Sequence, residues 1–349
     1  MTVETVDLAP GYTISRIIMG GWQLSDGHGE IDRERAIAGM FDFVAQGIAA
    51  FDCADIYTGV EETYGEFLRR YERKFGPQAA RAIKIHTKYV PDYDALSTLT
   101  KDQVRATVER SLRRLGRERL DLVQFSWWNY GVEGWLETMD WLNDLRQDGK
   151  IDLLGTTNFD SAHVASMAEA GAPIAANQLQ YSVLDRRPDR FMADVCGAHG
   201  IKMLCYGTLA GGFLSERWLG QPEPAEPYAN RSLRKFKLII GEIGGWDALQ
   251  DLLGVLRTVA GSHDASIANI AVRYILNKPH VGAAIVGARN ADHLRNNLGV
   301  FALGLSGEDT RSIDEACARL TDLDGDVWDL ERDRTGPHGR IMKYDLGVS

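Results

Sequence analysis

Runs of apolar residues long enough for a β-strand alternate with amphipathic stretches along most of this chain. Eight such runs lie between Arg16 and Leu298. In the stretches between them, apolar residues recur every three to four positions, the period of an α-helix with one buried face. The expected strands are residues 16–20, 47–52, 82–88, 119–126, 151–157, 174–181, 201–206 and 283–286, and the expected helices are residues 33–46, 61–74, 101–115, 132–148, 160–169, 188–198, 265–277 and 290–298.

Strands that alternate with helices favour a closed parallel barrel. Parallel neighbours are joined by right-handed crossovers, and eight such units are the number that closes a (β/α)8 or TIM barrel. We therefore predict an α/β fold with a single barrel domain over residues 1–349. An open, doubly wound sheet is the alternative. No expected strand is followed by the Gly-x-Gly-x-x-Gly turn with which such sheets bind dinucleotides.

Helix boundaries and three other segments add detail to this prediction. Thr100 and Gln103 have the spacing of a capping box, which predicts a helix start. The Pro10-Gly11 turn within residues 1–14 predicts a β-hairpin that closes the bottom of the barrel. Residues 208–245, rich in glycine and proline, are expected to form a long cofactor and substrate loop after the seventh strand. The charged tail, residues 322–349, is expected to lie near the barrel mouth.

Composition and charge narrow the classes of partner. The net charge of −10 opposes binding to nucleic acids or anionic membranes, which depends on clustered Lys and Arg. Residues 1–10 lack the features of a signal peptide, and no apolar run approaches the ~18 residues of a membrane span. The four cysteines (Cys53, Cys196, Cys205 and Cys317) are widely spaced within apolar segments, which favours reduced, packed thiols. We therefore expect a cytoplasmic protein without a metal site.

Three side chains that carry chemistry follow neighbouring strands. Asp52 and Tyr57 come at and after the end of the second expected strand, and Lys88 ends the third. Because the carboxyl ends of parallel strands meet at one face of a barrel, we expect these side chains to converge. A nearby ammonium stabilises a phenolate, so Lys88 is expected to lower the pKa of Tyr57, and Asp52 to hold Lys88 charged. Tyr57 could then act as a proton donor or acceptor.

The chain resembles the aldo-keto reductases from about Gly20 to Leu298. The segment from Phe51 to Tyr57 is similar to the family segment that supplies the catalytic aspartate and tyrosine, and Thr87-Lys88 to the one that supplies the lysine. The resemblance implies NADPH (or NADP+) as cofactor, with NADH possible, and a small carbonyl substrate. It implies cofactor binding by Gly21, Trp22, Thr157, Asn158, Gln178, Tyr206, Gly207, Leu209, Gly212, Gly287, Arg289, His293 and Asn297.

The chemistry of these residues agrees with that assignment. The amides of Asn158 and Gln178 match a nicotinamide carboxamide, Tyr206 can stack on a flat ring, and Arg289 offers a forked donor to phosphate. A helix start near Asn290 would add its dipole. Several of these residues also have a structural alternative: the two amides as turn formers or surface amides, Arg289 as an exposed charge at a helix start, Asp52 as a helix cap or a strand-end ion-pair partner, and Tyr57 as a packing residue.

Ser126 departs from the family pattern, which usually has a histidine there. Serine offers only a weak neutral hydrogen bond and no pKa in the working range. Three hypotheses follow: a site with weakened reduction, natural or engineered; a site where water replaces the imidazole; or a pocket used for other chemistry. Strand alternation points His86 inward one layer below Lys88, where we expect a structural histidine whose hydrogen bonds are satisfied.

Aromatic residues near the strand ends suggest an apolar substrate pocket, formed by Trp22, Tyr89, Trp127 and Trp128, although these residues could equally be structural anchors. The leading hypothesis is reduction of an aldehyde or ketone, with Asp52, Tyr57, Lys88 and Ser126 as the catalytic residues. The first alternative is a nucleotide-binding sensor with slow or vestigial redox activity. The second is a lyase or isomerase that uses Lys88 as a Schiff-base amine.

Overall fold

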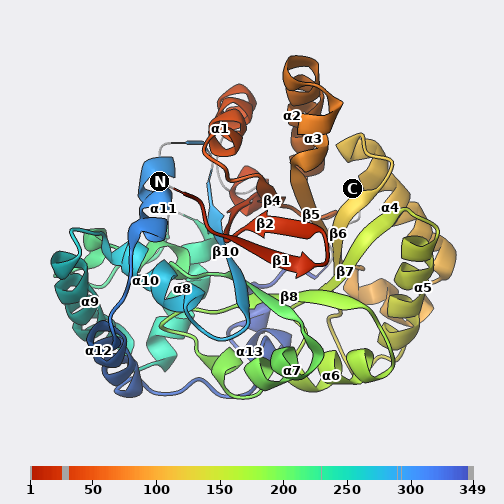
Figure 1. Cartoon of the computed structure of the whole chain (residues 1–349). Helices are drawn as coiled ribbons and strands as arrows, with labels where there is room; N and C mark the ends of the chain where they lie inside the picture. Colours follow the sequence, from red (N-terminus) through yellow and green to blue (C-terminus); the bar gives the residue numbers. More distant parts are fainter. Residues whose placement is uncertain (1, 26–30, 229, 289, 292, 345–349) are drawn as a thin grey trace.

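A closed barrel of eight parallel strands forms the centre of the molecule, and helices surround it (Figure 1). The structure is a computed structural model that describes residues 2–25, 31–228, 230–288, 290–291 and 293–344. The strands follow each other around the barrel in chain order, and the last pairs with the first, which confirms the predicted TIM barrel. Its strands are β3 (Ile17–Gly20), β4 (Ala50–Asp52), β5 (Lys84–Tyr89), β6 (Leu120–Phe125), β7 (Ile151–Thr157), β8 (Ile174–Gln180), β9 (Lys202–Tyr206) and β10 (Val281–Gly287).

The helices confirm the expected alternation and add elements that the sequence pattern missed. They are α1 (Arg33–Ala45), α2 (Val60–Phe75), α3 (Pro77–Ala82), α4 (Lys101–Leu115), α5 (Trp135–Gln147), α6 (Ser161–Glu169), α7 (Met192–His199), α8 (Arg231–Glu242), α9 (Gly245–Ser262), α10 (Ile267–Leu276), α11 (Leu294–Gly299), α12 (Gly307–Ala318) and α13 (Asp329–Arg332). The capping box of Thr100 and Gln103 starts α4 as predicted. Helices α3, α8, α9, α12 and α13 were not expected, although Ser306 and Asp309 form a second capping box at the start of α12.

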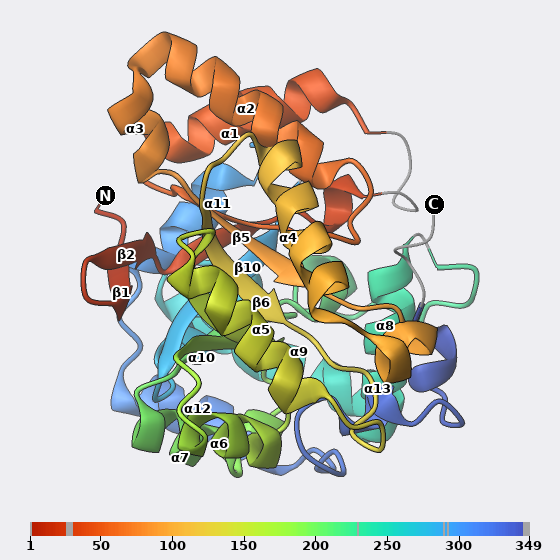
Figure 2. The same ribbon diagram turned by 90° about the vertical axis from the view of Figure 1, so that its right-hand side faces the viewer.

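An antiparallel hairpin closes one end of the barrel. Strands β1 (Thr5–Ala9) and β2 (Tyr12–Ser15) flank the Pro10-Gly11 turn, as predicted. Leu8, Tyr12 and Ile14 of the hairpin pack against inward-facing barrel residues. Figure 2 shows the hairpin at one end of the barrel and α8 and α13 at the opposite end. The hairpin therefore seals the end away from the carboxyl termini of the strands.

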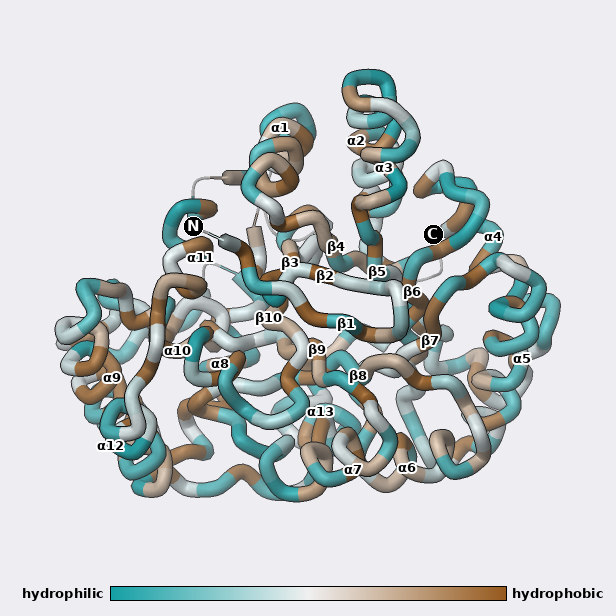
Figure 3. The backbone as a smooth tube through the Cα atoms, viewed as in Figure 1, coloured by the Kyte–Doolittle hydropathy of each residue, from teal (hydrophilic) through white to brown (hydrophobic). Residues whose placement is uncertain are grey.

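Two hydrophobic layers result from the alternation of side chains along the strands. Inward-facing residues such as Leu122, Ala176 and Leu204 form a small core inside the barrel, continuous with the hairpin. Outward-facing residues such as Phe51, Val123 and Leu179 join the larger core between the barrel and the helices. In Figure 3 the outer helices, for example α2, α5 and α12, carry hydrophilic residues on turns that face away from the barrel. All four cysteines are buried.

The connection after β9 is more ordered than a loop. Residues 208–245, expected as a long loop, contain helix α8, whose Leu233, Phe236, Ile239 and Ile240 are buried. The prolines of this segment, with Gly211, Gly212 and Gly220, lie before the helix, and apolar residues at helical spacing stabilise α8 against its neighbours. No helix in the described part of the chain is long and apolar enough to cross a membrane.

Candidate active site

A buried ion pair joins the ends of β4 and β5. The Nζ atom of Lys88 lies 2.7 and 2.9 Å from the two carboxylate oxygens of Asp52 and donates a third bond to the Cys53 carbonyl at 2.7 Å. Both side chains are 6% exposed. Burial by itself favours the neutral amine, but Asp52, together with Tyr57 and Cys53, outweighs the effect of burial, so the pKa of Lys88 is raised. Lys88 is therefore a fixed ammonium.

Two glutamines surround the carboxylate of Asp52. The side-chain amides of Gln124 and Gln178 donate to Oδ1 of Asp52 at 3.2 and 2.6 Å, and Gln178 also donates to Oε1 of Gln124 at 3.0 Å. Gln124 was not predicted as a site residue. Its signal was the strand alternation that places it on the same inward face as Ser126. These donors supply the hydrogen bonds that a carboxylate with so little exposure to solvent requires.

Tyr57 lies above this ion pair in the loop that follows β4. Its ring centre is 5.1 Å from Nζ of Lys88 and 4.9 Å from the Trp22 ring. Gly21 permits the chain after β3 to approach the end of β4, because its N–H donates to the Asp52 carbonyl at 2.7 Å and a Cβ there would lie 2.7 Å from the same oxygen. Burial raises the pKa of Tyr57 above its usual range, and Lys88 only partly opposes that effect. The expected lowering of this pKa is therefore wrong in its net direction.

Asn158 and Gln178 leave a complementary pair of polar atoms. Oδ1 of Asn158 accepts a hydrogen bond from the Tyr206 hydroxyl at 2.8 Å, which leaves the Asn158 amide nitrogen as a donor. The Gln178 amide nitrogen is committed to Asp52 and Gln124, which leaves Oε1 as an acceptor, with no donor to it among the described residues. One donor and one acceptor are what a primary carboxamide requires. A nicotinamide amide therefore fits the residues present.

Ser126 follows β6 on its inward face, two residues beyond Gln124. The Ser126 N–H donates to the Tyr89 carbonyl at 3.0 Å, and the side chain is buried. His86 lies inside the barrel as predicted, but the described residues provide no hydrogen bond to either ring nitrogen, so the expectation of satisfied hydrogen bonds was wrong. Burial, with Lys88 and Lys84 nearby, lowers the pKa of His86 to about 3. The imidazole is neutral at physiological pH.

The structure separates the four aromatic residues predicted for a substrate pocket. Trp22 lies beside Tyr57, as described above. Tyr89 and Trp127 are buried in the outer core between barrel and helices, because they alternate with the inward-facing Lys88 and Ser126. They therefore act as structural anchors and do not face the barrel interior. Trp128 is half-buried in the loop after β6, where its indole N–H donates to the Pro91 carbonyl at 2.7 Å.

The other predicted cofactor residues lie at the same end of the barrel. Thr157 pairs with Gln178 at the end of β7, and Gly287 ends β10 beside Gly20. Gly207 has a φ of 73°, and a Cβ there would contact the Phe236 ring of α8. The remaining predicted residues with described positions are Leu209 and Gly212 in the loop after β9, and His293 and Asn297 at the start of and within α11.

Arg289 lies outside the described residues. Helix α11 begins at Leu294 and spans only six residues, so the expected helix start near Asn290 was wrong. The argument that a helix dipole near Asn290 binds phosphate is therefore not supported by this fold.

The C-terminal tail contributes contacts that the sequence analysis missed. Arg332 donates from Nη2 to the Tyr130 hydroxyl at 2.6 Å and to the backbone carbonyl of Asn158. Glu331 pairs with Arg187 at 3.4 Å and with Lys235 of α8 at 3.2 Å. No local pattern marks these tail residues, because their partners lie far away in the sequence.

A family profile and individual known proteins match most of this chain. Residues 16–318 match the profile described as the aldo/keto reductase family. The NADH-specific methylglyoxal reductase of Escherichia coli strain K12 is 25% identical over 322 residues, which cover 88% of this chain and 96% of that protein. Flagellar radial spoke protein 5 of Chlamydomonas reinhardtii is 28% identical over 257 residues and 63% of this chain, and the match spans about half, 48%, of that longer protein.

Solved structures agree with the barrel fold. The glycerol dehydrogenase AKR11B4 from Gluconobacter oxydans superposes with a TM-score of 0.76 at 23% identity, covering 93% of this chain and 97% of that one. A thermostable aldo-keto reductase, Tm1743, gives a TM-score of 0.70 at 23% identity, covering 90% of this chain and 100% of that one. At this level of identity the likeness concerns the fold alone.

Proposed function

Because this chain belongs to the aldo/keto reductase family of oxidoreductases, whose members use NAD(P)H, we propose that it reduces an aldehyde or ketone to an alcohol with Tyr57 as the proton donor. The observation that carries the proposal is the buried Lys88 and Asp52 pair beside the Tyr57 ring. A phenol whose pKa is raised remains protonated at neutral pH, as an acid in reduction must be.

The proposed roles divide between the cofactor and the residues of this chain. Bound NAD(P)H supplies a hydride from its nicotinamide ring to the carbonyl carbon. Tyr57 donates its proton to the carbonyl oxygen as negative charge develops there, and the Lys88 ammonium stabilises the phenolate that remains. Asp52, held by Gln124 and Gln178, keeps Lys88 charged and in place. Asn158, Gln178 and Tyr206 would hold the nicotinamide of the bound cofactor.

Steady-state assays with the purified protein test this proposal. We expect oxidation of NADPH at 340 nm that depends on an added carbonyl from a panel of aldehydes, ketones and 2-oxoaldehydes. We expect NADPH to bind more tightly than NADH in fluorescence titrations, with both bound measurably. A protein that binds neither dinucleotide would contradict the proposal. Tighter binding of NADH would contradict only the expected preference for NADPH. One relative is named an NADH-specific methylglyoxal reductase.

Ser126 favours a second candidate function, a dinucleotide-binding sensor with slow turnover. A serine hydroxyl cannot assist proton transfer as an imidazole does.

We expect Ser126→His to raise kcat by about tenfold or more, because general acid–base assistance commonly contributes about 10² to 10⁴. Steady-state kinetics with the best carbonyl of the panel measures the effect, and Ser126→Ala is the matched control with little expected change. Equal kcat values for the wild type and the histidine variant, with cofactor binding retained, would show that no imidazole is missing.

A Schiff-base mechanism on Lys88 is disfavoured. A lysine nucleophile must be neutral, and such lysines are found where burial or a neighbouring cation lowers the pKa. The pKa of Lys88 is raised instead, and its ammonium donates to two oxygens of Asp52 and to the Cys53 carbonyl. The amine is therefore committed to three acceptors within the protein.

A further inference from the structure

Arg332 connects the tail to the ends of two barrel strands. Its Nη2 atom donates to the Tyr130 hydroxyl, to the Trp127 carbonyl at 3.4 Å and to the Asn158 carbonyl. The guanidinium also lies 4.1 Å from the centre of the Tyr130 ring. Trp127 and Tyr130 belong to the loop after β6, and Asn158 follows β7 directly. One side chain of the tail therefore holds both loops at the mouth.

Asn158 is the residue in this group whose conformation needs support. Its φ is +60°, in the left-handed region that is unfavourable for residues other than glycine, although asparagine tolerates it better than most. Three groups hold it there: the Gln178 carbonyl accepts from its N–H at 2.8 Å, the Tyr206 hydroxyl donates to Oδ1, and Arg332 donates to its carbonyl. This backbone conformation determines the position of the Asn158 side-chain amide nitrogen, which is the donor proposed for the nicotinamide.

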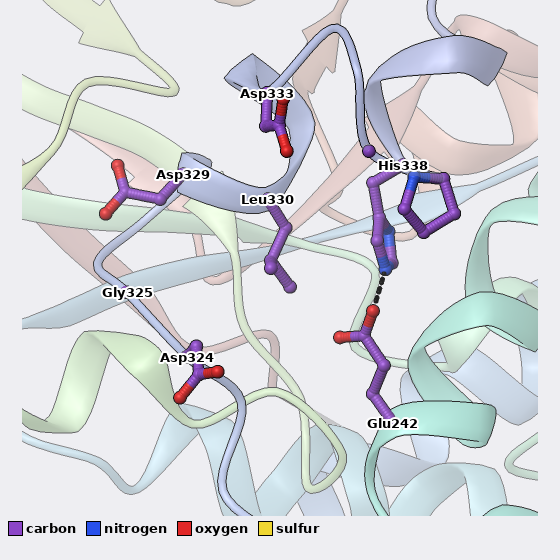
Figure 4. A pocket seen from close by; sticks show the side chains of 9 residues that line it. Glu242, Asp324, Gly325, Asp329, Leu330, Asp333 and His338 are labelled. Carbon is purple, nitrogen blue, oxygen red and sulfur yellow. Dashed lines mark hydrogen bonds and ion pairs between the residues drawn. The ribbon is translucent and has the colours of Figure 1, made fainter.

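The tail that carries Arg332 is itself fixed at neighbouring points. Glu331 is fully buried and pairs with Arg187, from the loop after β8, and with Lys235 of α8. Burial favours the neutral acid, but Lys235 and Arg187 lower the pKa of Glu331 to about 2. Glu331 is therefore a carboxylate in both ion pairs. Further along, the buried His338 ring binds the Glu242 carboxylate at 2.8 Å, beside a cavity of about 180 Å³ between the tail and α8 (Figure 4). The tail is therefore bonded to the rest of the protein on both sides of Arg332.

We propose that Arg332 is a positioning residue that sets nicotinamide affinity by fixing Asn158 in its left-handed conformation. The inference rests on the proposed function, because Asn158 matters here only as a ligand of the nicotinamide carboxamide. The tail thereby governs the affinity of the cofactor through a residue that touches no part of it. Loss of the Arg332 side chain is therefore expected to leave the binding of the adenosine end of the cofactor unchanged.

The test compares whole dinucleotides with fragments that lack nicotinamide. For Arg332→Ala we expect the dissociation constant of NADPH to rise roughly tenfold, the scale on which a left-handed conformation is disfavoured. The dissociation constant of 2′,5′-ADP is expected to remain unchanged, and the pair NADH and ADP-ribose is measured in the same way. Arg340→Ala is the matched control, because Arg340 is an exposed tail arginine outside this cluster. Both of its constants should stay at the wild-type values.

A double-mutant cycle separates positioning from general loss of structure. In an Asn158→Ala background, Arg332→Ala should weaken NADPH binding no further. If Arg332→Ala does not fold, Arg332→Lys replaces it, since lysine retains the charge but lacks the forked donor geometry. An equal loss of affinity for NADPH and for 2′,5′-ADP would overturn the inference about Arg332 but not the proposed function. A full tenfold loss of NADPH affinity in the Asn158→Ala background would have the same consequence. A wild-type protein that binds neither dinucleotide overturns the proposed function and the inference with it.

Discussion

Replacing Tyr57 by phenylalanine is expected to reduce the single-turnover rate of NADPH oxidation by about 10² to 10⁴, the usual contribution of a general acid. The change removes one oxygen atom and leaves the ring beside Trp22 and Lys88 in place. Cofactor binding should therefore persist, and rapid mixing of the saturated complex with a carbonyl measures the chemical step directly.

The control for this variant is Tyr71→Phe. Tyr71 is a half-buried tyrosine of α2 that packs against Phe41, Phe67 and Phe75 on the outside of the barrel. It should retain the wild-type rate. An unchanged single-turnover rate in Tyr57→Phe would rule out the proton transfer that we propose, whatever the binding constants.

Replacing Lys88 by methionine is expected to affect activity and stability together. The Asp52 carboxylate would remain buried without its cation, and loss of one partner of a buried pair costs about 3–5 kcal/mol of unfolding free energy. Without the ammonium, the Tyr57 phenolate also loses its stabilisation, so we expect the rate to fall by about 100-fold or more. Urea unfolding and single-turnover kinetics provide the two measurements.

The double variant Lys88→Met/Asp52→Asn separates the two effects. Neutralising Asp52 removes the unpaired charge, so stability should largely return while activity stays low. Lys84→Met is the control on the same strand, since Lys84 pairs with Asp121 near the hairpin end and has no contact with Tyr57 in the structure. Near-normal activity in the Lys88→Met variant would exclude an essential role for its ammonium.

Several features of the site followed from local sequence. Asp52 and Lys88 end adjacent parallel strands, so their meeting is a consequence of the barrel. Alternation along β5 and β6 also carried the signal that Lys88 and Ser126 face inward while Tyr89 and Trp127 face outward. For Tyr89 and Trp127 the same alternation favours the structural role over the substrate pocket. Alternation also faces Gln124 inward, but it does not show that its amide donates to Asp52.

Other features depended on packing at a distance. The direction of the Tyr57 pKa follows from burial, which no neighbouring residue in the sequence reveals. One of the groups that donate to Asp52 belongs to Gln178, which lies 126 residues later in the chain.

The sequence by itself therefore determined the barrel, its hairpin and the strand ends where the charged residues meet, because period and strand order are local properties of the chain. Only the tertiary structure decided which side chains form hydrogen bonds and ion pairs with one another. Arg332 reaches Asn158 across 174 residues, and such a contact depends on how the tail folds back over the mouth. Burial and long-range hydrogen bonds arise from the whole packed chain, and they set the charge and the shape of the site.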